Sequence, residues 1–428
     1  MKCPAHLDDV DLFAPGAQEH WFAAYDILHE HAPVQRVPGE GYLPDTDGFI
    51  LSRFEDIEKV VKNPERFPPT LTLGAQALKR ADIPIEEQTH VNAMVASIVT
   101  LRPTMALWRS HKQELTDPWV GTGASRHEDM IRGFVNQLID NWTDKTEIEF
   151  ISEFARPLPQ MVMATILGFP LQDIPQLAKW GAAQVMPFVY GKGHRNELSQ
   201  AQLEAQFKEL DGFKEYVREK VQEKRARPGN DMISFLTQTT YKALGRKLSD
   251  IEINGVVYAM VIGGLETTQY AIEEEAQLLC ETDGLWQQLK ADRSKLRAFT
   301  EESMRLRSPT QGLSTRTTSQ DEVFQGVHVP KGSMLHLRWG AANRDPTAFQ
   351  RAKEMDLDRQ PITRHLTFSA GPRTCPGNAL SRLEQTIAWD CLLDRLERIE
   401  YAPGNTFEHQ PGIMLGTLEL KLKIEKAA

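Results

Sequence analysis

One cysteine near the end of the chain lies in a context that favours an anionic sulfur. Residues 368–377 read FSAGPRTCPG, and Cys375 is one of four cysteines in the sequence. Pro376 suits the first position of a helix predicted over 378–396, which would put the sulfur at the helix N-terminus. There, free amide groups and the positive end of the helix dipole favour a thiolate. A lone cysteine is usually an inert core residue, but this context predicts an anionic ligand.

The neighbours of Cys375 suit a flat, apolar partner that carries a carboxylate. Gly371 and Gly377 leave room for a planar group to approach the backbone. Phe368 offers an apolar face to cover the sulfur, and Arg373 is a fixed cation suited to a carboxylate. We therefore expect this segment to form one wall of a ligand site.

A second segment with chemical potential lies in the middle of a helical pattern. Residues 263–268 read GGLETT, and each glycine inside a helix costs about 1 kcal/mol relative to alanine. Gly263, Glu266 and Thr267 share one helix face. The Thr267 hydroxyl can bond back to the carbonyl of Gly263 and widen the helix, and Glu266 can supply protons through Thr267 and water. The alternative is a close helix–helix contact at the glycines beside a solvated Glu266.

The elements that must position these residues are mostly helices. The pattern around GGLETT predicts a helix over 250–279, about 30 residues and roughly 45 Å long, which must cross the interior. Ser249 and Glu252 form a capping box at its start. A charged amphipathic helix is predicted over 197–227.

Strand patterns are short and few. The predicted strands are Gly48–Arg53, Glu147–Phe150, Val323–Val329, Met334–Leu337 and a group near the C-terminus. No repeat, low-complexity tract or long linker marks a boundary. We therefore expect a mainly α protein with small β-sheets, folded as a single domain over residues 1–428.

Composition narrows the class of protein. The chain has 428 residues and a formal net charge of −10, with 41% hydrophobic and 25% charged residues, an ordinary globular balance. The negative charge argues against general binding to nucleic acid or anionic membranes. The four cysteines are too scattered for a disulfide framework or a CxxC metal site. Residues 1–30 carry neither a signal peptide nor a membrane anchor. We expect a cytoplasmic monomer without a membrane span.

Several strings occur in the order found in one enzyme family. The string Phe368-x-x-Gly371-x-Arg373-x-Cys375-x-Gly377 matches the haem-binding signature of the cytochrome P450 family in full, and this match is highly specific. The other similar strings are NPERF (63–67), GGLETT (263–268), Glu302-Ser-Met-Arg305 and AANRDPTAF (341–349). The chain thus resembles that family over most of its length. The resemblance implies the cytochrome P450 fold, a triangular prism with a long central helix.

The resemblance also implies a cofactor and an activity. Haem b would be bound with the Cys375 thiolate as iron ligand, which favours O–O cleavage. The protein would be a mono-oxygenase that inserts one atom of O2 into a lipophilic small molecule by hydroxylation, demethylation or epoxidation. Glu266 and Thr267 resemble the acid and alcohol of the family's oxygen-activation segment, with glutamate where many members have aspartate. Peroxide-driven relatives usually lack this pair. A peroxygenase or isomerase, and a non-catalytic haem sensor, remain alternatives.

Further residues are implied as supports of the haem site. Glu302 and Arg305 resemble the ion pair of the family's ExxR helix, which a third residue completes. We favour Arg359 as this third member, with Arg344 as the competitor.

Haem propionates need cations or hydrogen-bond donors. Arg373 and Arg316 match positions that supply them in the family. Trp108 and Lys112 look like the W-x-x-x-R arrangement of other members with Lys in place of Arg, and His111 can substitute for Lys112.

Electrons must come from a separate protein, because the sequence holds no flavin or nicotinamide fingerprint. By resemblance the donor is a ferredoxin or a flavodoxin, with its reductase. We expect it to dock near Arg109, Lys112 and Arg364, a basic patch on an acidic protein.

By family topology the substrate pocket has mainly apolar walls, which suits a terpenoid, steroid or fatty acid. The predicted walls are Pro68–Leu107, Met186–Tyr190, Ala259–Gly263, Thr310–Leu313 and the turn at Ile413 and Met414. Any of them can instead be ordinary core. Arg80, His90 and Arg102 can anchor a substrate carboxylate or be solvated.

Overall fold

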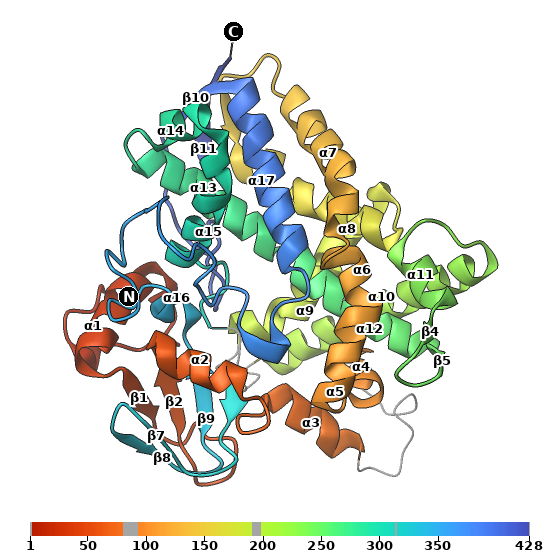
Figure 1. The fold of residues 1–428 in the computed structure, drawn as a ribbon, viewed down its shortest axis with the longest axis vertical. Helices are drawn as coiled ribbons and strands as arrows, with labels where there is room; N and C mark the ends of the chain where they lie inside the picture. Colours follow the sequence, from red (N-terminus) through yellow and green to blue (C-terminus); the bar gives the residue numbers. More distant parts are fainter. Residues whose placement is uncertain (1, 80–92, 191–197, 313–314, 428) are drawn as a thin grey trace.

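The computed structural model describes residues 2–79, 93–190, 198–312 and 315–427. It is predominantly helical with small sheets, as predicted, and its outline is roughly triangular when seen down its shortest axis (Figure 1). The helices are α1 (Trp21–His31), α2 (Phe54–Lys62), α3 (Thr70–Lys79), α4 (Ala93–Leu101), α5 (Met105–His111), α6 (Asp117–Val120), α7 (Glu128–Asp140), α8 (Pro157–Leu167), α9 (Ile174–Tyr190), α10 (Gln200–Ala226), α11 (Met232–Gln238), α12 (Asp250–Gly264), α13 (Thr267–Glu281), α14 (Leu285–Ala291), α15 (Leu296–Leu306), α16 (Trp339–Ala342) and α17 (Asn378–Arg395). The strands are β1 (Val34–Val37), β2 (Gly48–Leu51), β3 (Glu147–Glu149), β4 (Thr240–Tyr241), β5 (Arg246–Lys247), β6 (Thr315–Thr317), β7 (Glu322–Phe324), β8 (Val327–Val329), β9 (Met334–Leu337), β10 (Leu396–Tyr401) and β11 (Lys421–Lys426).

A four-stranded sheet joins early and late segments of the chain. Its order is β1-β2-β9-β6, with β2 and β9 parallel and the outer pairs antiparallel. Gly48 of β2 lies opposite Met334 of β9. Both strands are buried along their full length, which explains why they read as apolar runs and not as alternating patterns.

One predicted strand is a hairpin. The segment predicted as a strand over 323–329 forms β7 and β8, which pair antiparallel. Gln325 and Gly326 connect them with φ angles of 47° and 79°, the left-handed conformation that a tight hairpin turn requires. A second sheet, in the order β10-β11-β3, lies near the C-terminus.

The interior helix is divided into α12 and α13. Ser249 and Glu252 form the capping box predicted at the start of α12. Leu265 and Glu266 separate the two helices, so the predicted continuous helix is interrupted within GGLETT. The low helix propensity of this segment makes the interruption inexpensive.

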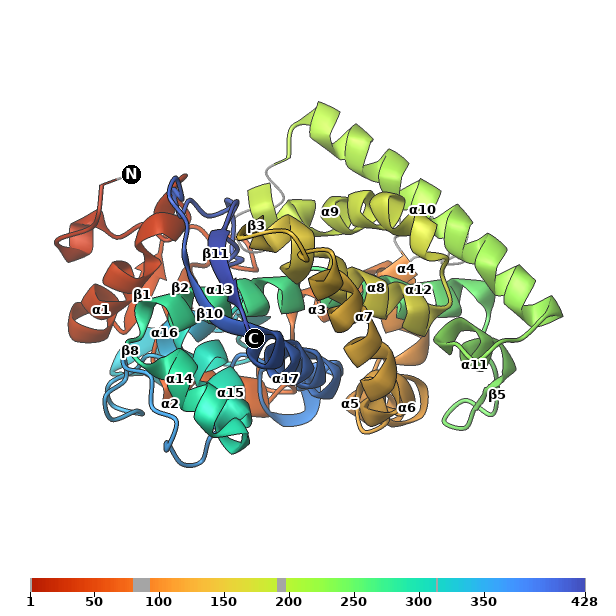
Figure 2. The same cartoon turned by 90° about the horizontal axis from the view of Figure 1, so that it is seen from above.

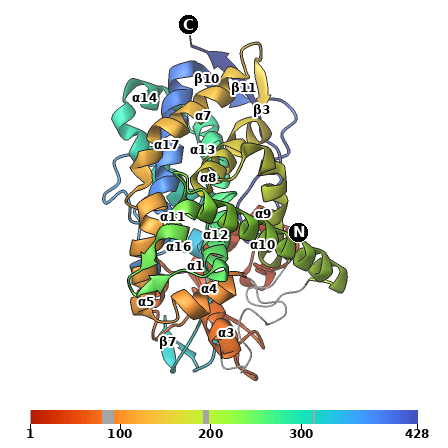
Figure 3. The ribbon, with the colours of Figure 1, turned by 90° about the vertical axis from the view of Figure 1, so that its right-hand side faces the viewer.

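Other helices surround this axis. Helices α4, α8, α9 and α10 contact α12, while α15 and α17 contact α13. Helix α10 lies along the outside of α9 and α12 (Figure 2), and Figure 3 shows the same layer from the side. The largest hydrophobic core draws residues from α7, α8, α12 and α17. Within the described ranges no helix is long and apolar enough to cross a membrane.

Candidate active site

Cys375 lies in a turn between a short 3-10 helix, Gly371–Arg373, and helix α17. The backbone N–H of Cys375 donates to the carbonyl of Phe368 at 2.9 Å, and the Asn378 side chain donates to the carbonyl of Cys375 at 2.5 Å. Helix α17 begins at Asn378. The prediction that Pro376 is the first helical residue is therefore wrong, and the sulfur lies one turn of chain before the helix.

The surroundings of Cys375 do not make it a thiolate by themselves. Burial raises the pKa of the Cys375 thiol, while the N–H groups of Gly377 and Asn378 and the charges of Lys112 and Arg382 lower it. The net rise is expected of a sulfur kept from water. A bound metal cation reverses it, because a coordinating thiol loses its proton. The turn therefore assists an anionic sulfur without creating one.

The two glycines of the cysteine segment serve different purposes. Gly371 has a φ of +70°, and a Cβ there would lie 3.0 Å from the Cα of Lys62 in α2. Gly371 is thus required by the turn and by its contact with α2, which corrects the expectation that it leaves room for a flat group. A Cβ on Gly377 would meet no atom within 4 Å in the described part of the chain. Open space beside Cys375 is therefore found at Gly377.

The interruption between α12 and α13 also borders open space. The Thr267 hydroxyl donates to the carbonyl of Gly263 at 2.7 Å, as predicted from their spacing. A Cβ on Gly263 would meet no described atom within 4 Å, whereas a Cβ on Gly264 would lie 2.4 Å from Cε of Met163 in α8. The sequence left open whether these glycines make room for a ligand or for a close helix–helix contact, and the structure shows one of each. Gly263 borders open space, and Gly264 permits a close helix–helix contact.

Glu266 is a largely buried carboxyl group held by a tyrosine. Its Oε2 accepts a hydrogen bond from the Tyr270 hydroxyl at 3.0 Å. Burial raises the pKa of Glu266, and the bond from Tyr270 and the charge of Arg156 oppose the rise. A carboxyl group with a raised pKa holds a proton closer to neutral pH, which suits a general acid. The solvated Glu266 of the alternative interpretation is not observed.

Three arginines form a cationic cluster in which Arg373 and Arg102 lie against Trp108 and Arg316 lies near Arg373. The guanidinium carbons of Arg373 and Arg102 lie 4.0 and 4.5 Å from the centroid of this ring. Burial lowers the pKa of Arg102 to about 10, of Arg316 to about 9 and of Arg373 to about 10, and Arg373 also repels Arg102 and Arg316. The Nε atoms of all three have no hydrogen-bond partner among the described residues. Such a cluster fits an anionic ligand.

His111 belongs to this cluster. It is 4% exposed, and its Nε2 has no hydrogen-bond partner in the described structure. Burial and the charge of Arg102 hold the pKa of His111 well below its usual range, so the ring is neutral. Lys112 instead acts on Cys375, because its positive charge lowers the pKa of that thiol. Arg102 is neither solvated nor free for a distant substrate, because it is 8% exposed and lies on Trp108 beside Arg373.

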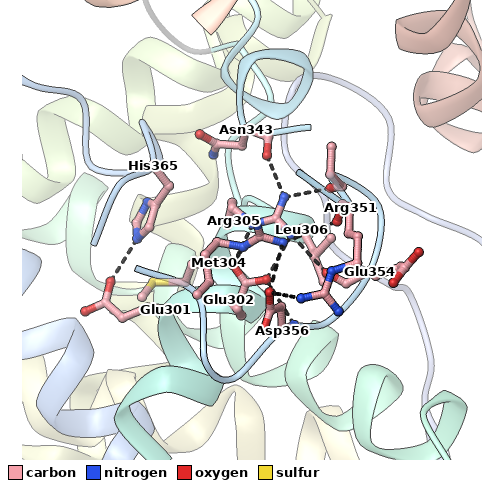
Figure 4. Close-up of polar contacts among 12 residues, drawn as sticks. Glu301, Glu302, Met304, Arg305, Leu306, Asn343, Arg351, Glu354, Asp356 and His365 are labelled. Atoms are coloured by element: carbon pink, nitrogen blue, oxygen red, sulfur yellow. Dashed lines mark hydrogen bonds and ion pairs between the residues drawn. The ribbon is translucent and has the colours of Figure 1, made fainter. Parts of the chain in front are cut away.

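A buried ion pair joins Glu302 and Arg305 of α15 and contacts the irregular segment after α16 (Figure 4). The guanidinium of Arg305 donates to both carboxylate oxygens of Glu302, at 2.6 and 2.9 Å. It also donates to backbone carbonyls of Asn343, Ala352 and Glu354, at 2.8, 2.7 and 3.1 Å. Both side chains are at most 2% exposed. The pair therefore fastens α15 to the irregular segment that precedes Cys375.

Arg359 is the third member of this network. Its Nε donates to Oε1 of Glu302 at 2.8 Å. Arg344 instead donates to the carbonyl of Leu306 at 3.2 Å and lies over the ring of Phe22. The geometry therefore favours Arg359 over Arg344, as expected from the sequence.

A second buried network lies beside the first. Glu301 accepts two bonds from Arg382, at 2.6 and 3.0 Å, and approaches Nε2 of His365 at 2.8 Å. Arg382 in turn lies 4.4 Å from the centroid of Phe368. These contacts fix the start of the cysteine segment and cover Phe368 with a cation.

Comparison with known proteins identifies the family. The family model described as Cytochrome P450 matches residues 60–424. The chain belongs to the cytochrome P450 family. It is 32% identical over 391 residues to a biotin biosynthesis cytochrome P450 of Bacillus subtilis, covering 89% of this chain and 90% of the relative. It is 30% identical over 272 residues to the polyketide biosynthesis cytochrome P450 PksS of the same species, covering 64% of each.

Solved structures agree with this assignment. P450BioI in complex with an acyl carrier protein ligated to hexadec-9Z-enoic acid has a TM-score of 0.79 and 25% identity, covering 95% of this chain and 99% of that one. CYP109E1 of Bacillus megaterium in complex with testosterone has a TM-score of 0.77 and 25% identity, covering 95% and 98%. The predicted cytochrome P450 fold and the class of mono-oxygenase are therefore confirmed.

The residues of this cytochrome P450 fit a haem. Open space borders Gly377 beside Cys375, and it also borders Gly263 where the helix opens at Thr267. The buried arginine Nε atoms without partners fit the two propionates of haem b. The sequence analysis missed Arg102 in this role, because no motif links it to Trp108. It also missed the support from Glu301, His365 and Arg382, although Glu301 directly precedes the predicted Glu302.

Two of the predicted pocket walls contact α12 in this cytochrome P450, and two others contact each other. Helices α4 and α9 contact α12, and Thr310 forms an isolated β-bridge with the buried Met414. Arg80, His90 and Leu313 lie outside the described residues.

Proposed function

We propose that this cytochrome P450 inserts one atom of O2 into a lipophilic small molecule, with haem b held by Cys375 and electrons supplied by a separate protein. The observation that carries the proposal is the Thr267 hydroxyl bonded to the carbonyl of Gly263 at 2.7 Å, one residue from a buried acid. When bound, haem supplies the iron at which O2 is activated. The remaining requirements fall on side chains of this chain.

Each group of side chains has a separate task. Cys375 is the proposed iron ligand, and Arg102, Arg316 and Arg373 are the proposed partners of the propionates. The Thr267 hydroxyl gives its hydrogen to Gly263, so its oxygen is free to accept a bond from water. Glu266 holds the proton that passes to this water and hydroxyl, since burial raises its pKa.

Glu266 and Thr267 support a reaction in which O2 is activated with electrons from a reductant, and they argue against the two alternative functions. A haem sensor needs a ligand and a pocket but no proton donor. A peroxygenase or isomerase acts without reductant, and peroxide-driven relatives usually lack an acid beside an alcohol at these positions. The raised pKa of Glu266, together with the opened helix at Thr267, therefore supports the mono-oxygenase.

The proposed substrate is a fatty acyl compound, steroid or terpenoid. The relatives named above include one bound to a fatty acyl carrier protein and one bound to testosterone. The apolar walls around α12 suit such molecules. A substrate carboxylate would not use Arg102, because this residue lies in the cationic cluster.

The proposed electron donor is an acidic ferredoxin, or a flavodoxin, with its reductase. Arg109 is exposed on α5, and α5 contacts the 3-10 helix that precedes Cys375. Arg364 is also exposed and follows the irregular segment that Arg305 fastens. These cations would attract an acidic partner to the cysteine side of the molecule.

The test combines a spectrum with a turnover assay. The haem-loaded protein is reduced in carbon monoxide, and a long-wavelength thiolate-type Soret band is expected. Fatty acids, steroids and terpenoids are then screened for a shift from low-spin to high-spin iron, and the positive compounds are incubated with NADH, ferredoxin reductase and ferredoxin. Oxygenated products from the wild type, and none from Cys375→Ser, are expected. A wild type without the thiolate band, or a Cys375→Ser variant with normal turnover, would contradict the proposal.

A further inference from the structure

Helix α13 buries a continuous polar face. Its residues 269–277 read QYAIEEEAQ, and Glu273, Glu274 and Glu275 are 0%, 2% and 0% exposed. Glutamates are rarely fully buried without a partner or a purpose. Tyr270 follows Glu266 by four residues, Glu273 and Glu274 follow Tyr270 by three and four, and Gln277 follows them by four and three, so these side chains lie along one side of the helix. The face starts at the proposed proton donor.

The inner end of this face is the pair of Glu266 and Tyr270. Their hydrogen bond measures 3.0 Å. The Tyr270 ring has room only because residue 416 is glycine, since a Cβ there would lie 2.5 Å from the ring. Gln410 also lies near enough to lower the pKa of the Tyr270 hydroxyl. Glu266 and the close fit against Gly416 therefore fix the phenol.

The middle of the face holds two adjacent carboxyl groups near Thr417. Glu273 accepts from Gln269 at 2.6 Å, and its Oε2 has no hydrogen-bond partner among the described residues. Burial holds the pKa of Glu273 well above its usual range, which favours the protonated form. The Thr417 hydroxyl donates to Oε1 of Glu274 at 3.4 Å. Gln277 bonds both Glu274 and Thr417, at 3.0 and 2.9 Å.

The outer end of the face reaches water through His409. Nε2 of His409 lies 3.9 Å from Oε1 of Glu274, and Nδ1 lies 2.9 Å from Oε2 of Glu19. The side chains of His409 and Glu19 are 18% and 33% exposed. An imidazole that bridges an exposed and a buried carboxylate can take up a proton on one ring nitrogen and release one from the other.

We propose that the polar face of α13 is a proton-supply route that reloads Glu266 from solvent at the His409–Glu19 edge, with Tyr270 as the positioning residue at its inner end. The proposal rests on the function proposed above. Only protons move along the route. When Glu266 releases a proton toward Thr267, Tyr270 passes its hydroxyl proton to Glu266 and takes up one from Glu273 through water. Glu273 recovers a proton from Glu274 through water and the Thr417 hydroxyl, Glu274 recovers one from His409, and His409 takes one up from solvent.

Two arginines lie near the carboxyl groups of the route and can stabilise the negative charge that these groups carry when they give up a proton. Arg156, after the π-helical turn at 151–155, acts on both Glu266 and Glu273. Arg307, after α15, donates to Glu274 at 3.1 Å. Burial raises the pKa of Tyr270, so the phenol does not persist as an anion and must give and receive protons together. The cations thus lie beside the carboxyl groups, where a negative charge appears briefly as a proton passes.

The test compares isosteric variants in the haem-loaded protein. Tyr270→Phe, Glu273→Gln and His409→Gln are measured against Glu275→Gln. Glu275 is an equally buried neighbour, but its Oε2 accepts from Trp389 at 2.6 Å, away from the route. Product per NADH is expected to fall about tenfold in the three route variants, as for a lost hydrogen bond of about 1.4 kcal/mol, while peroxide release and the solvent deuterium effect on turnover increase. The Glu275→Gln control is expected to match the wild type.

Two further measurements separate the route from a structural effect. Turnover with iodosylbenzene, which donates an oxygen atom and needs no protons, is expected to be unchanged in all variants. In the ferric resting protein, the infrared band of the Glu266 acid, identified by its loss in Glu266→Gln, is expected to titrate at higher pH in Tyr270→Phe. The sign follows because the Tyr270 bond lowers the pKa of Glu266. This readout does not depend on activity.

The outcomes distinguish this inference from the proposed function. The route would be overturned if its three variants formed as much product per NADH as Glu275→Gln, or if the Glu266 band did not shift in Tyr270→Phe. In either case, product from the wild type would still uphold the mono-oxygenase. A wild type with no product from any reductant or oxidant would instead overturn the proposed function and the route together.

Discussion

Replacing Arg102 by glutamine tests the cationic cluster, because the structure predicts opposite effects on two forms of the protein. The pKa of Arg102 falls from 12.5 to about 10, chiefly through burial and then through repulsion by Arg373. Arginine keeps its proton in proteins, so this fall measures the cost of holding the cation without an anion. At about 1.4 kcal/mol for each pKa unit, the cost is about 3 kcal/mol.

The haem-free protein should therefore become more stable when Arg102 is replaced. Loss of the contact with Trp108 offsets the gain by about 1 kcal/mol, which leaves an increase of about 2 kcal/mol in the free energy of unfolding. The haem-loaded protein should change in the other direction. Loss of one charge-assisted bond to a propionate costs about 1.5–3 kcal/mol, or roughly a 10- to 100-fold faster loss of haem.

Two assays measure these effects. Urea unfolding followed by circular dichroism reports on the haem-free protein, and transfer of haem to excess apomyoglobin, followed by absorbance, reports on the loaded one. Arg109→Gln is the matched control, because Arg109 lies on the adjacent helix α5 but is exposed. Haem loss at the wild-type rate from Arg102→Gln, or haem-free Arg102→Gln that is less stable than the wild type, would refute the reasoning.

Three further variants test the supports, the alcohol and the electron donor. Arg359→Met loses the bond to Glu302 at 2.8 Å, so we expect the free energy of unfolding of the loaded protein to fall by about 2 kcal/mol. Arg344→Met is the control, since it loses only a bond to the carbonyl of Leu306 and should change the melting temperature little. Equal thermal shifts in the two variants would contradict the assignment of Arg359. Thr267→Ala should reduce product per NADH by about tenfold or more and release peroxide, because a positioned proton donor speeds a reaction by at least that factor. If Thr267→Ala instead forms as much product per NADH as the wild type, the result would support the haem sensor. Arg109→Glu should raise the KM for ferredoxin about fivefold at low salt and less at high salt, while Lys423→Glu on β11 serves as control. A KM for Arg109→Glu that never departs from the control would remove the docking site.

Features that depend on residues close together in the chain could be predicted from the sequence. The capping box of Ser249 and Glu252, the bond from Thr267 to Gly263 and the strand Met334–Leu337 all depend on residues near one another in the chain, and the structure contains each of them. The hairpin at Gln325 and the interruption at Leu265 were missed, because periodicity does not reveal where a short pattern turns.

The candidate site was predictable where a family string carried it and not where tertiary contacts built it. Cys375 and Glu302 stand in such strings. Arg102 became visible only because folding brings it beside Trp108 and Arg373. Tyr270 needed the glycine at 416 from another segment. Contacts of this kind leave no spacing pattern in a single sequence.

The contact between Gly371 and helix α2 constrains the order in which the protein matures. The segment that carries Cys375 rests on Lys62, and β2 is held beside β9. Pairings between such distant parts of a chain form late. During synthesis on the ribosome, the first strands and α2 must therefore wait with apolar surface uncovered until almost the entire polypeptide has emerged. The uncovered N-terminal segments are where chaperones would bind in the meantime, and a haem could load only after these late pairings form.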